Sequence, residues 1–194
     1  MEDNKTLPFI LKNIEYARKI SRENQSVNVV IVVSGNKLDK DTWQQRLGKN
    51  SHYLFNSNNS TKILSLQEKI GKKRKEGNFL GTLLAYIKLK DSAQRENFSF
   101  KECVTLIGML FGRGERMSPF TQIEGDRKPA IIVSSRSIGD GKSFTAIEEA
   151  LFYFVPVAKY LEQRGFRGVL NKWGDETEIP SIDLTKIPGK GSEF

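Results

Sequence analysis

The sequence predicts an α/β fold in which a mostly parallel, Rossmann-like sheet is flanked by helices. Two runs, 27–33 and 104–111, are rich in β-branched and apolar residues, which is typical of strands buried on both faces. A long segment with helical spacing, 145–164, lies between a third predicted strand, 129–133, and another apolar stretch, 166–170. Strand, helix and strand in this order form a βαβ unit, whose strands are parallel.

The first half of the chain supplies further elements of the same kind. Apolar residues at helical spacing predict a helix over 7–23, and a break at 34–36 follows the first strand. Asp39 is placed to cap a short helix that ends near Leu47, and 63–66 reads as a short strand. Asn78 is placed to cap the next helix, with one apolar face made by Leu80, Leu83, Leu84 and Ile87.

The second half adds a predicted third strand at 129–133, with Pro129 at its first position, and a polar loop at 134–143. Thr145 and Glu148 have the spacing of a capping box and mark the start of the long helix. Gly165 is placed to end that helix as its C′ residue. We divide the chain into a basic N-terminal α/β extension (1–97), a second α/β region (98–187) and a disordered tail (188–194).

Composition excludes several classes of site. With one cysteine, Cys103, and one histidine, His52, the 194-residue chain has neither an internal disulfide nor a Cys/His zinc site of the usual four ligands. A Ser-His-Asp triad would have to use His52, which lies in a polar stretch. No apolar run is long enough to cross a bilayer, so we expect a soluble cytoplasmic protein without membrane contact.

The positive charge is confined to one half of the chain. Residues 1–100 contain 18 Lys and Arg against 10 Asp and Glu, which accounts for the whole net charge of +8. The excess peaks at 69–75, in the sequence KIGKKRK. Such a run is either a solvated face or an anion-binding face for nucleic acid or phosphorylated ligands.

Residues 112–129, GRGERMSPFTQIEGDRKP, have the chemistry of a phosphate-binding loop directly after a buried strand. Gly112 and Gly114 leave no Cβ between backbone and ligand, so successive N–H groups can form an anion nest. Arg113 and Arg116 add positive charge, and the loop also contains the hydroxyl donors Ser118 and Thr121.

The same loop resembles the nucleotide-binding signature of sugar-1-phosphate nucleotidyltransferases, a strand followed by G-G-x-G-[ST]-R-[LM]-x-P-[LF]-[ST] and then K-P. The matching residues are Gly112, Gly114, Arg116, Met117, Pro119, Phe120, Thr121, Lys128 and Pro129. Phe111 stands where the family has its first glycine, and Glu115 where it has a small hydroxyl residue. The match covers about a tenth of the chain, and it implies that 98–187 is a nucleotide-binding region.

The resemblance implies a reaction and its residues. A nucleotidyl group would pass from a nucleoside triphosphate to a sugar-1-phosphate, with release of pyrophosphate. The loop backbone, with Gly112, Arg113, Gly114, Ser118 and Thr121, would hold the nucleotide. Arg116 and Lys128 would be the catalytic contacts to phosphate, and a Mg²⁺ ion would bridge the phosphates.

Asp175 is the metal ligand that the resemblance implies, because Trp173-Gly174-Asp175 looks like the strand-end Gly-Asp of the family. A role for Asp175 in capping a turn stays open, and the neighbouring Lys172 is expected to be a solvated lysine. Gly81-Thr82 resembles the Gly-Thr turn of the family, but its apolar surroundings favour a core helix. The alternative function is a non-catalytic basic module that binds nucleic acid or a protein partner.

Overall fold

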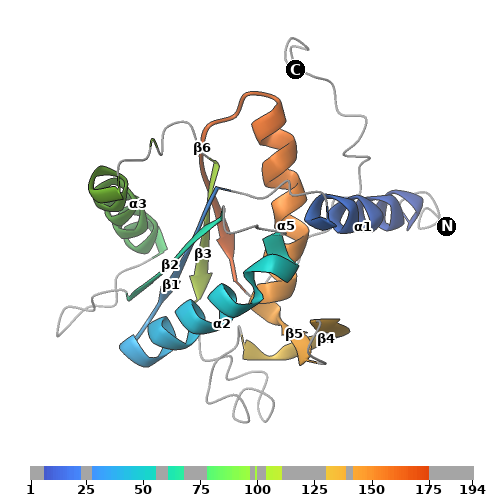
Figure 1. Ribbon diagram of the computed structural model, residues 1–194, viewed down its shortest axis with the longest axis horizontal. Helices are drawn as coiled ribbons and strands as arrows, with labels where there is room; N and C mark the ends of the chain where they lie inside the picture. The colour runs from blue at the N-terminus through green and yellow to red at the C-terminus, as the bar shows by residue number, and fades with distance from the viewer. Residues whose placement is uncertain are drawn as a thin grey trace.

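The computed structural model describes residues 7–22, 28–55, 61–67, 78–96, 99, 104–110, 130–138 and 142–174. Its centre is a four-stranded, all-parallel sheet in the order β2-β1-β3-β6. The strands are β1 (Val29–Ser34), β2 (Lys62–Gln67), β3 (Val104–Leu110) and β6 (Gly168–Trp173). The predicted fold class, a parallel α/β sheet with flanking helices, is confirmed (Figure 1).

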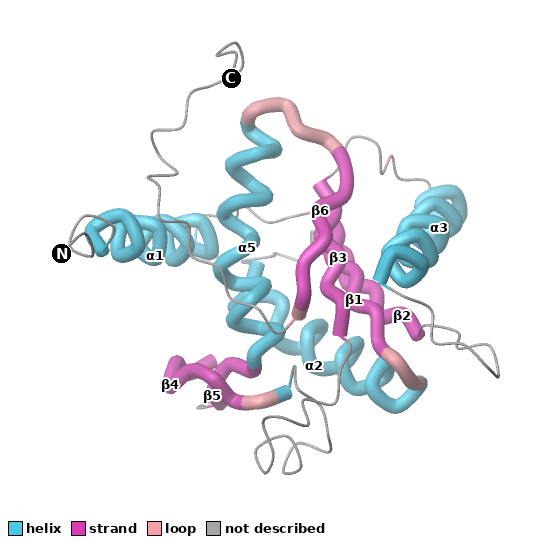
Figure 2. Tube along the Cα trace, turned by 180° about the vertical axis from the view of Figure 1, so that it is seen from behind, coloured by secondary structure: helices cyan, strands magenta, loops and turns pink. Residues whose placement is uncertain are grey.

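Helices cover both faces of the sheet. Helix α2 (Lys37–Phe55) and helix α5 (Ala146–Gln163) pack on the face of Val30, Val32 and Leu106. Helix α3 (Asn78–Glu96) packs on the opposite face through Ala85 and Leu89. Helix α1 (Leu7–Arg22) lies outside α5, so the two views show three layers with one additional helix (Figures 1 and 2).

The two apolar strands and the long helix lie largely where the sequence predicts them. The apolar runs form β1 and β3, and every residue of these two strands is buried, as expected for strands covered on both faces. Glu148 accepts a hydrogen bond from the Thr145 N–H at 2.9 Å, which confirms the predicted capping box of α5. Gly165 follows α5 with a φ of 86°, the left-handed conformation expected of a C′ glycine.

Helix α2 differs from the prediction at both ends. It is capped by Asn36, whose side-chain oxygen accepts the Asp39 N–H at 2.8 Å, and it continues through Phe55 instead of ending near Leu47. The continuation buries Leu54 and Phe55 in the core. Burial of apolar surface outweighs the low helix propensity of the intervening Gly48.

The predicted apolar face of α3 is wrong at two of its four residues, whereas Leu84 is half-buried. Leu83 and Ile87 are 42% and 47% exposed, whereas the small residues Ala85 and Ala93 are buried together with Leu89. Small side chains on the inner face allow the helix to approach the sheet closely.

The predicted loop at 134–143 is an antiparallel hairpin of β4 (Ile132–Ile138) and β5 (Lys142–Thr145), outside the main sheet. The predicted third strand at 129–133 therefore begins later and pairs only with β5. Polar content indicated a loop, but a two-stranded hairpin needs only backbone pairing. Strands from both sides of residue 97 share the main sheet, since β1 pairs with β3; our three-part division stays a prediction.

Candidate functional site

The carboxyl end of the sheet contains a topological switch point between β1 and β3. From β1 the chain passes outward to β2 through α2, and it returns through α3 to the other side of β1. Helices α2 and α3, which lead to and from the outer strand β2, lie on opposite faces of the sheet, whereas α2 and α5, which come after β1 and β3, share one face. Open α/β sheets bind their ligands in the crevice outside the carboxyl ends of the strands at such a point. A ligand site is therefore expected at the carboxyl ends of β1, β3 and β6.

Ser34 ends β1 at the switch point and is paired in register with Leu110 of β3. Its side chain is 0% exposed, and its hydroxyl has no hydrogen-bond partner in the described part of the protein. A buried hydroxyl without a partner is uncommon in native structures and is one of the marks of a functional site. A Cβ built on the next residue, Gly35, would meet no atom within 4 Å, so the backbone there adjoins open space.

The N-terminus of α2 already has a side-chain cap and a carboxylate of its own. Asn36 accepts the Asp39 N–H and donates from Nδ2 to the Asp39 carboxylate at 2.6 Å. The negative charge of Asp39 occupies the position that favours an anion at a helix N-terminus. We therefore do not assign a phosphate to the start of α2.

The carboxyl ends of β3 and β6 are joined by a backbone hydrogen bond. The Gly174 N–H donates to the Met109 carbonyl at 3.0 Å, which continues the β3–β6 pairing by one residue. A Cβ on Gly174 would overlap Leu110 Cδ2 and lie 3.0 Å from Ile147 Cδ1. A larger residue here would require Leu110 to shift, so the glycine of the Gly174-Asp175 pair has a packing reason that is independent of any ligand.

Two predicted motifs therefore leave the sheet from neighbouring strand ends. Leu110 is followed by the segment that carries Gly112, Gly114 and Arg116, and Gly174 is followed by Asp175. Thr82, near the start of α3, reaches the same edge, since its hydroxyl contacts Met109 Sδ at 3.8 Å. Gly81 is buried, as the core-helix interpretation requires.

Lys172, which was expected to be a solvated lysine, is buried. Its side chain is 7% exposed and lies on the α5 side of the sheet, with Nζ 6.0 Å from the centre of the Phe154 ring. The pleat of β6 directs this residue inward, and its register partner Gly108 has no side chain to occupy that space.

Every residue that we assigned to the nucleotide or the metal lies outside the described ranges. These residues are Gly112, Arg113, Gly114, Arg116, Ser118, Thr121, Lys128 and Asp175. The basic run 69–75 lies outside them as well. Within the described ranges, no three His, Cys, Asp or Glu side chains cluster as metal ligands, and no helix is long and apolar enough to cross a membrane.

A buried charge network joins α2 to the start of α5. Arg46 donates from Nε and Nη2 to the two carboxylate oxygens of Glu148 at 3.0 and 2.7 Å. Asn50 Nδ2, the Thr145 N–H and the Thr145 hydroxyl complete five donors to this carboxylate, which is 0% exposed. Sequence reasoning found the capping pair but missed Arg46, because a contact across 102 positions has no local signal.

Comparisons of the chain with protein-family models, with curated protein sequences and with solved structures found no match.

Proposed function

We propose that this protein binds a nucleoside triphosphate at the carboxyl end of its sheet and transfers the nucleotidyl group to a sugar-1-phosphate. The observation that supports this proposal best is the adjacency of two strand ends. Met109 of β3 accepts the Gly174 N–H at 3.0 Å, so the signature loop and Asp175 begin from neighbouring strands beside the switch point. Each of the two segments was expected from the sequence to follow a strand, but the sequence did not predict that these two strands are neighbours.

In this proposal the loop holds the triphosphate and the chemistry is displacement at the α-phosphorus. An oxygen of the sugar phosphate forms a bond to that phosphorus, and the bond to the β-phosphate oxygen breaks to release pyrophosphate. Gly112, Arg113, Gly114, Ser118 and Thr121 bind and orient the nucleotide. Arg116 and Lys128 neutralise charge on the phosphates, which together with alignment is the main task of a protein in this reaction.

Asp175 is the residue that we propose for Mg²⁺. A carboxylate at the carboxyl end of a strand fits a hard cation that takes oxygen ligands, with the remaining positions filled by phosphates and water. The ion, when bound, supplies additional charge neutralisation on the phosphates.

Thermal shift tests the nucleotide site. We expect one of UTP, TTP, CTP, ATP or GTP with Mg²⁺ to raise Tm, since a ligand at about 100 times its Kd stabilises the native state by about 2.7 kcal/mol. For a chain of this size that corresponds to roughly 5–10 °C. Arg116→Ala should remove the shift, whereas Arg95→Ala, an exposed arginine on α3, should retain it. No shift with any nucleotide would refute the proposal.

Catalysis is tested separately by pyrophosphate release from the stabilising nucleotide and glucose 1-phosphate. We expect release that depends on Mg²⁺ and is lost in Asp175→Asn. A nucleotide shift without release would limit the function to binding. If no nucleotide shifts Tm and the protein is instead retained on RNA in a salt-dependent way, lost when Lys72, Lys73, Arg74 and Lys75 become Ala, the alternative basic module is favoured.

A further inference from the structure

Trp173 is an accessible aromatic side chain at the carboxyl end of the sheet. The chain has two tryptophans, of which Trp43 is 2% exposed in the core and Trp173 is 36% exposed. Trp173 is the last residue of β6 and the register partner of Met109, and the following residue, Gly174, donates its N–H to the Met109 carbonyl. The indole therefore lies at the strand ends after which the signature loop and Asp175 begin.

The indole shares one face of β6 with a carboxamide. Successive side chains of a strand point to opposite faces, and the neighbouring Lys172 is buried on the α5 side, so Asn171 and Trp173 lie on the α3 side. Helix α3 packs through Ala85 and Leu89 against apolar residues of β1 and β3, and Asn171 is exposed, as Trp173 is. The carboxyl half of β6, the last strand of the sheet, thus presents one aromatic ring and one amide to solvent.

This pair of side chains has the chemistry that a nucleobase requires. An indole offers a flat apolar surface for a planar ring, and a carboxamide offers two N–H donors and an oxygen acceptor for the polar edge of that ring. Two positions along a strand correspond to about 6–7 Å, so the edge of a base stacked on the indole is within reach of the carboxamide. Neither side chain is charged, and the pair therefore suits a base better than a phosphate.

We propose that Trp173 stacks on the base of the bound nucleotide and that Asn171 hydrogen-bonds to the edge of this base. This assignment rests on the proposed nucleotide site and adds to it the residues that recognise the base. The base is the occupant because the indole lies one residue before Gly174, at the strand ends from which the proposed phosphate-binding loop continues. Open α/β sheets bind their ligands at this end of the strands.

Tryptophan fluorescence of the full chain tests the stacking contact. Titration with UTP, TTP, CTP, ATP and GTP in the presence of Mg²⁺ should give saturable quenching with the nucleotide that raises Tm. Pyrophosphate, which has no base, should not quench. In Trp173→Phe the quenching should disappear, because Trp43 is buried in the core. Calorimetry of the same variant should give a Kd within about fivefold of the wild type, since a phenyl ring still stacks.

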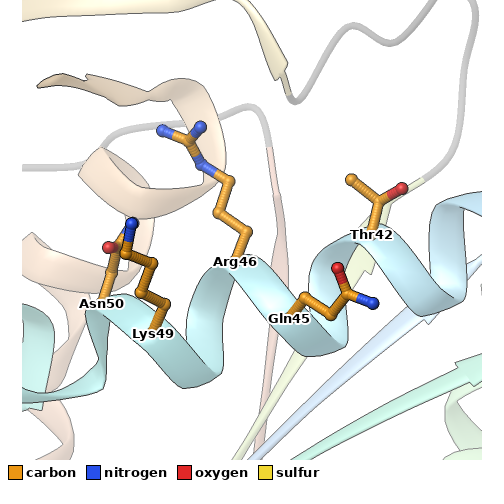
Figure 3. A pocket seen from close by; sticks show the side chains of 5 residues that line it. All are labelled: Thr42, Gln45, Arg46, Lys49 and Asn50. Atoms are coloured by element: carbon orange, nitrogen blue, oxygen red, sulfur yellow. The ribbon is translucent and has the colours of Figure 1, made fainter.

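Trp173→Leu keeps an apolar side chain and removes the aromatic face, so the nucleotide should bind at least ~10-fold more weakly, while circular dichroism remains that of the folded protein. The control is Gln45→Ala. Gln45 is exposed on α2, on the opposite face of the sheet, where it lines a hollow of about 320 Å³ (Figure 3). Its removal should leave the Kd within about twofold of the wild type, because distant sites act independently.

Asn171→Asp tests the contact to the base edge. A carboxylate accepts hydrogen bonds but cannot donate one, so it favours a base with an exocyclic amino group over a base with a carbonyl at that position. We expect the affinity ratio of CTP to UTP, or of ATP to GTP, to rise at least ~10-fold in whichever pair binds. The added negative charge weakens both members of a pair equally, and an unchanged ratio would remove Asn171 from the site.

The stacking contact is overturned if a nucleotide raises Tm without quenching, or if Trp173→Leu binds it as the wild type does, and the proposed nucleotide site then stands without Trp173. A larger loss in Gln45→Ala than in Trp173→Leu would place the nucleotide in the hollow on α2 and would also overturn it. Quenching that is lost in Trp173→Leu, without any release of pyrophosphate, would support this base site and refute catalysis. Neither a rise in Tm nor quenching with any nucleotide would refute both proposals.

Discussion

Arg46→Ala tests the buried charge network most directly. The Glu148 carboxylate is 0% exposed and accepts five hydrogen bonds, of which Arg46 supplies two and the only positive charge among its donors. Removing Arg46 leaves a buried carboxylate with hydrogen bonds from Asn50 and Thr145 but without its ion pair.

The expected loss can be estimated from these contacts. Breaking a buried ion pair by truncating one partner costs about 3–5 kcal/mol, because the other charge stays buried and uncompensated. Three donors remain on Glu148, and Arg46 itself is 30% exposed, so we expect the lower end, about 3 kcal/mol. For a chain of this size, that loss lowers Tm by roughly 6–12 °C.

Urea unfolding followed by circular dichroism measures this loss. Lys40→Ala is the control, since its ion pair with Asp41 is long, at 3.9 Å, and both side chains are solvent-accessible. That change should cost no more than about 0.5 kcal/mol. In a Glu148→Gln background, Arg46→Ala should cost about 1 kcal/mol or less, since no buried charge is left unpaired. A loss below about 1 kcal/mol in the wild-type background, or an equal loss in both backgrounds, would refute the reasoning.

Two further substitutions, Gly174→Ala and Ser34→Ala, test the strand ends, and Gly48→Ala on α2 serves as a comparison. Gly174→Ala should destabilise the protein by about 1–3 kcal/mol, because the added Cβ overlaps Leu110. Gly48→Ala, where a Cβ on α2 meets no atom within 4 Å, should stabilise it by roughly 0.5–1 kcal/mol. If both changes have the same sign in urea unfolding, the packing argument fails. Ser34→Ala removes a buried hydroxyl without a partner, so we expect unchanged or higher stability without ligand and a smaller nucleotide-induced rise in Tm. A loss of more than about 1 kcal/mol without ligand would mean that the hydroxyl has a structural partner.

The sequence by itself determined the fold class and most of its elements. Runs such as Val29–Ser34 and Val104–Leu110 have almost no polar residues, which is possible only for strands covered on both faces. Local chemistry also determined the start and end of α5, because capping by Thr145 and Glu148 and the left-handed Gly165 depend on neighbours within a few positions. The candidate phosphate loop and Asp175 were found from ordered residue types alone.

Tertiary structure alone decided what depends on distant partners. The inward face of α3 could not be read from its leucines, because the approach of the helix to the sheet favours Ala85 and Ala93 over the larger Leu83 and Ile87. Lys172 is buried because of the pleat and register of β6 beside β3. Arg46 meets Glu148 only when α2 and α5 pack on one face of the sheet. Strand order also placed the carboxyl ends of β3 and β6 side by side, because β6 returns beside β3 instead of extending the sheet elsewhere.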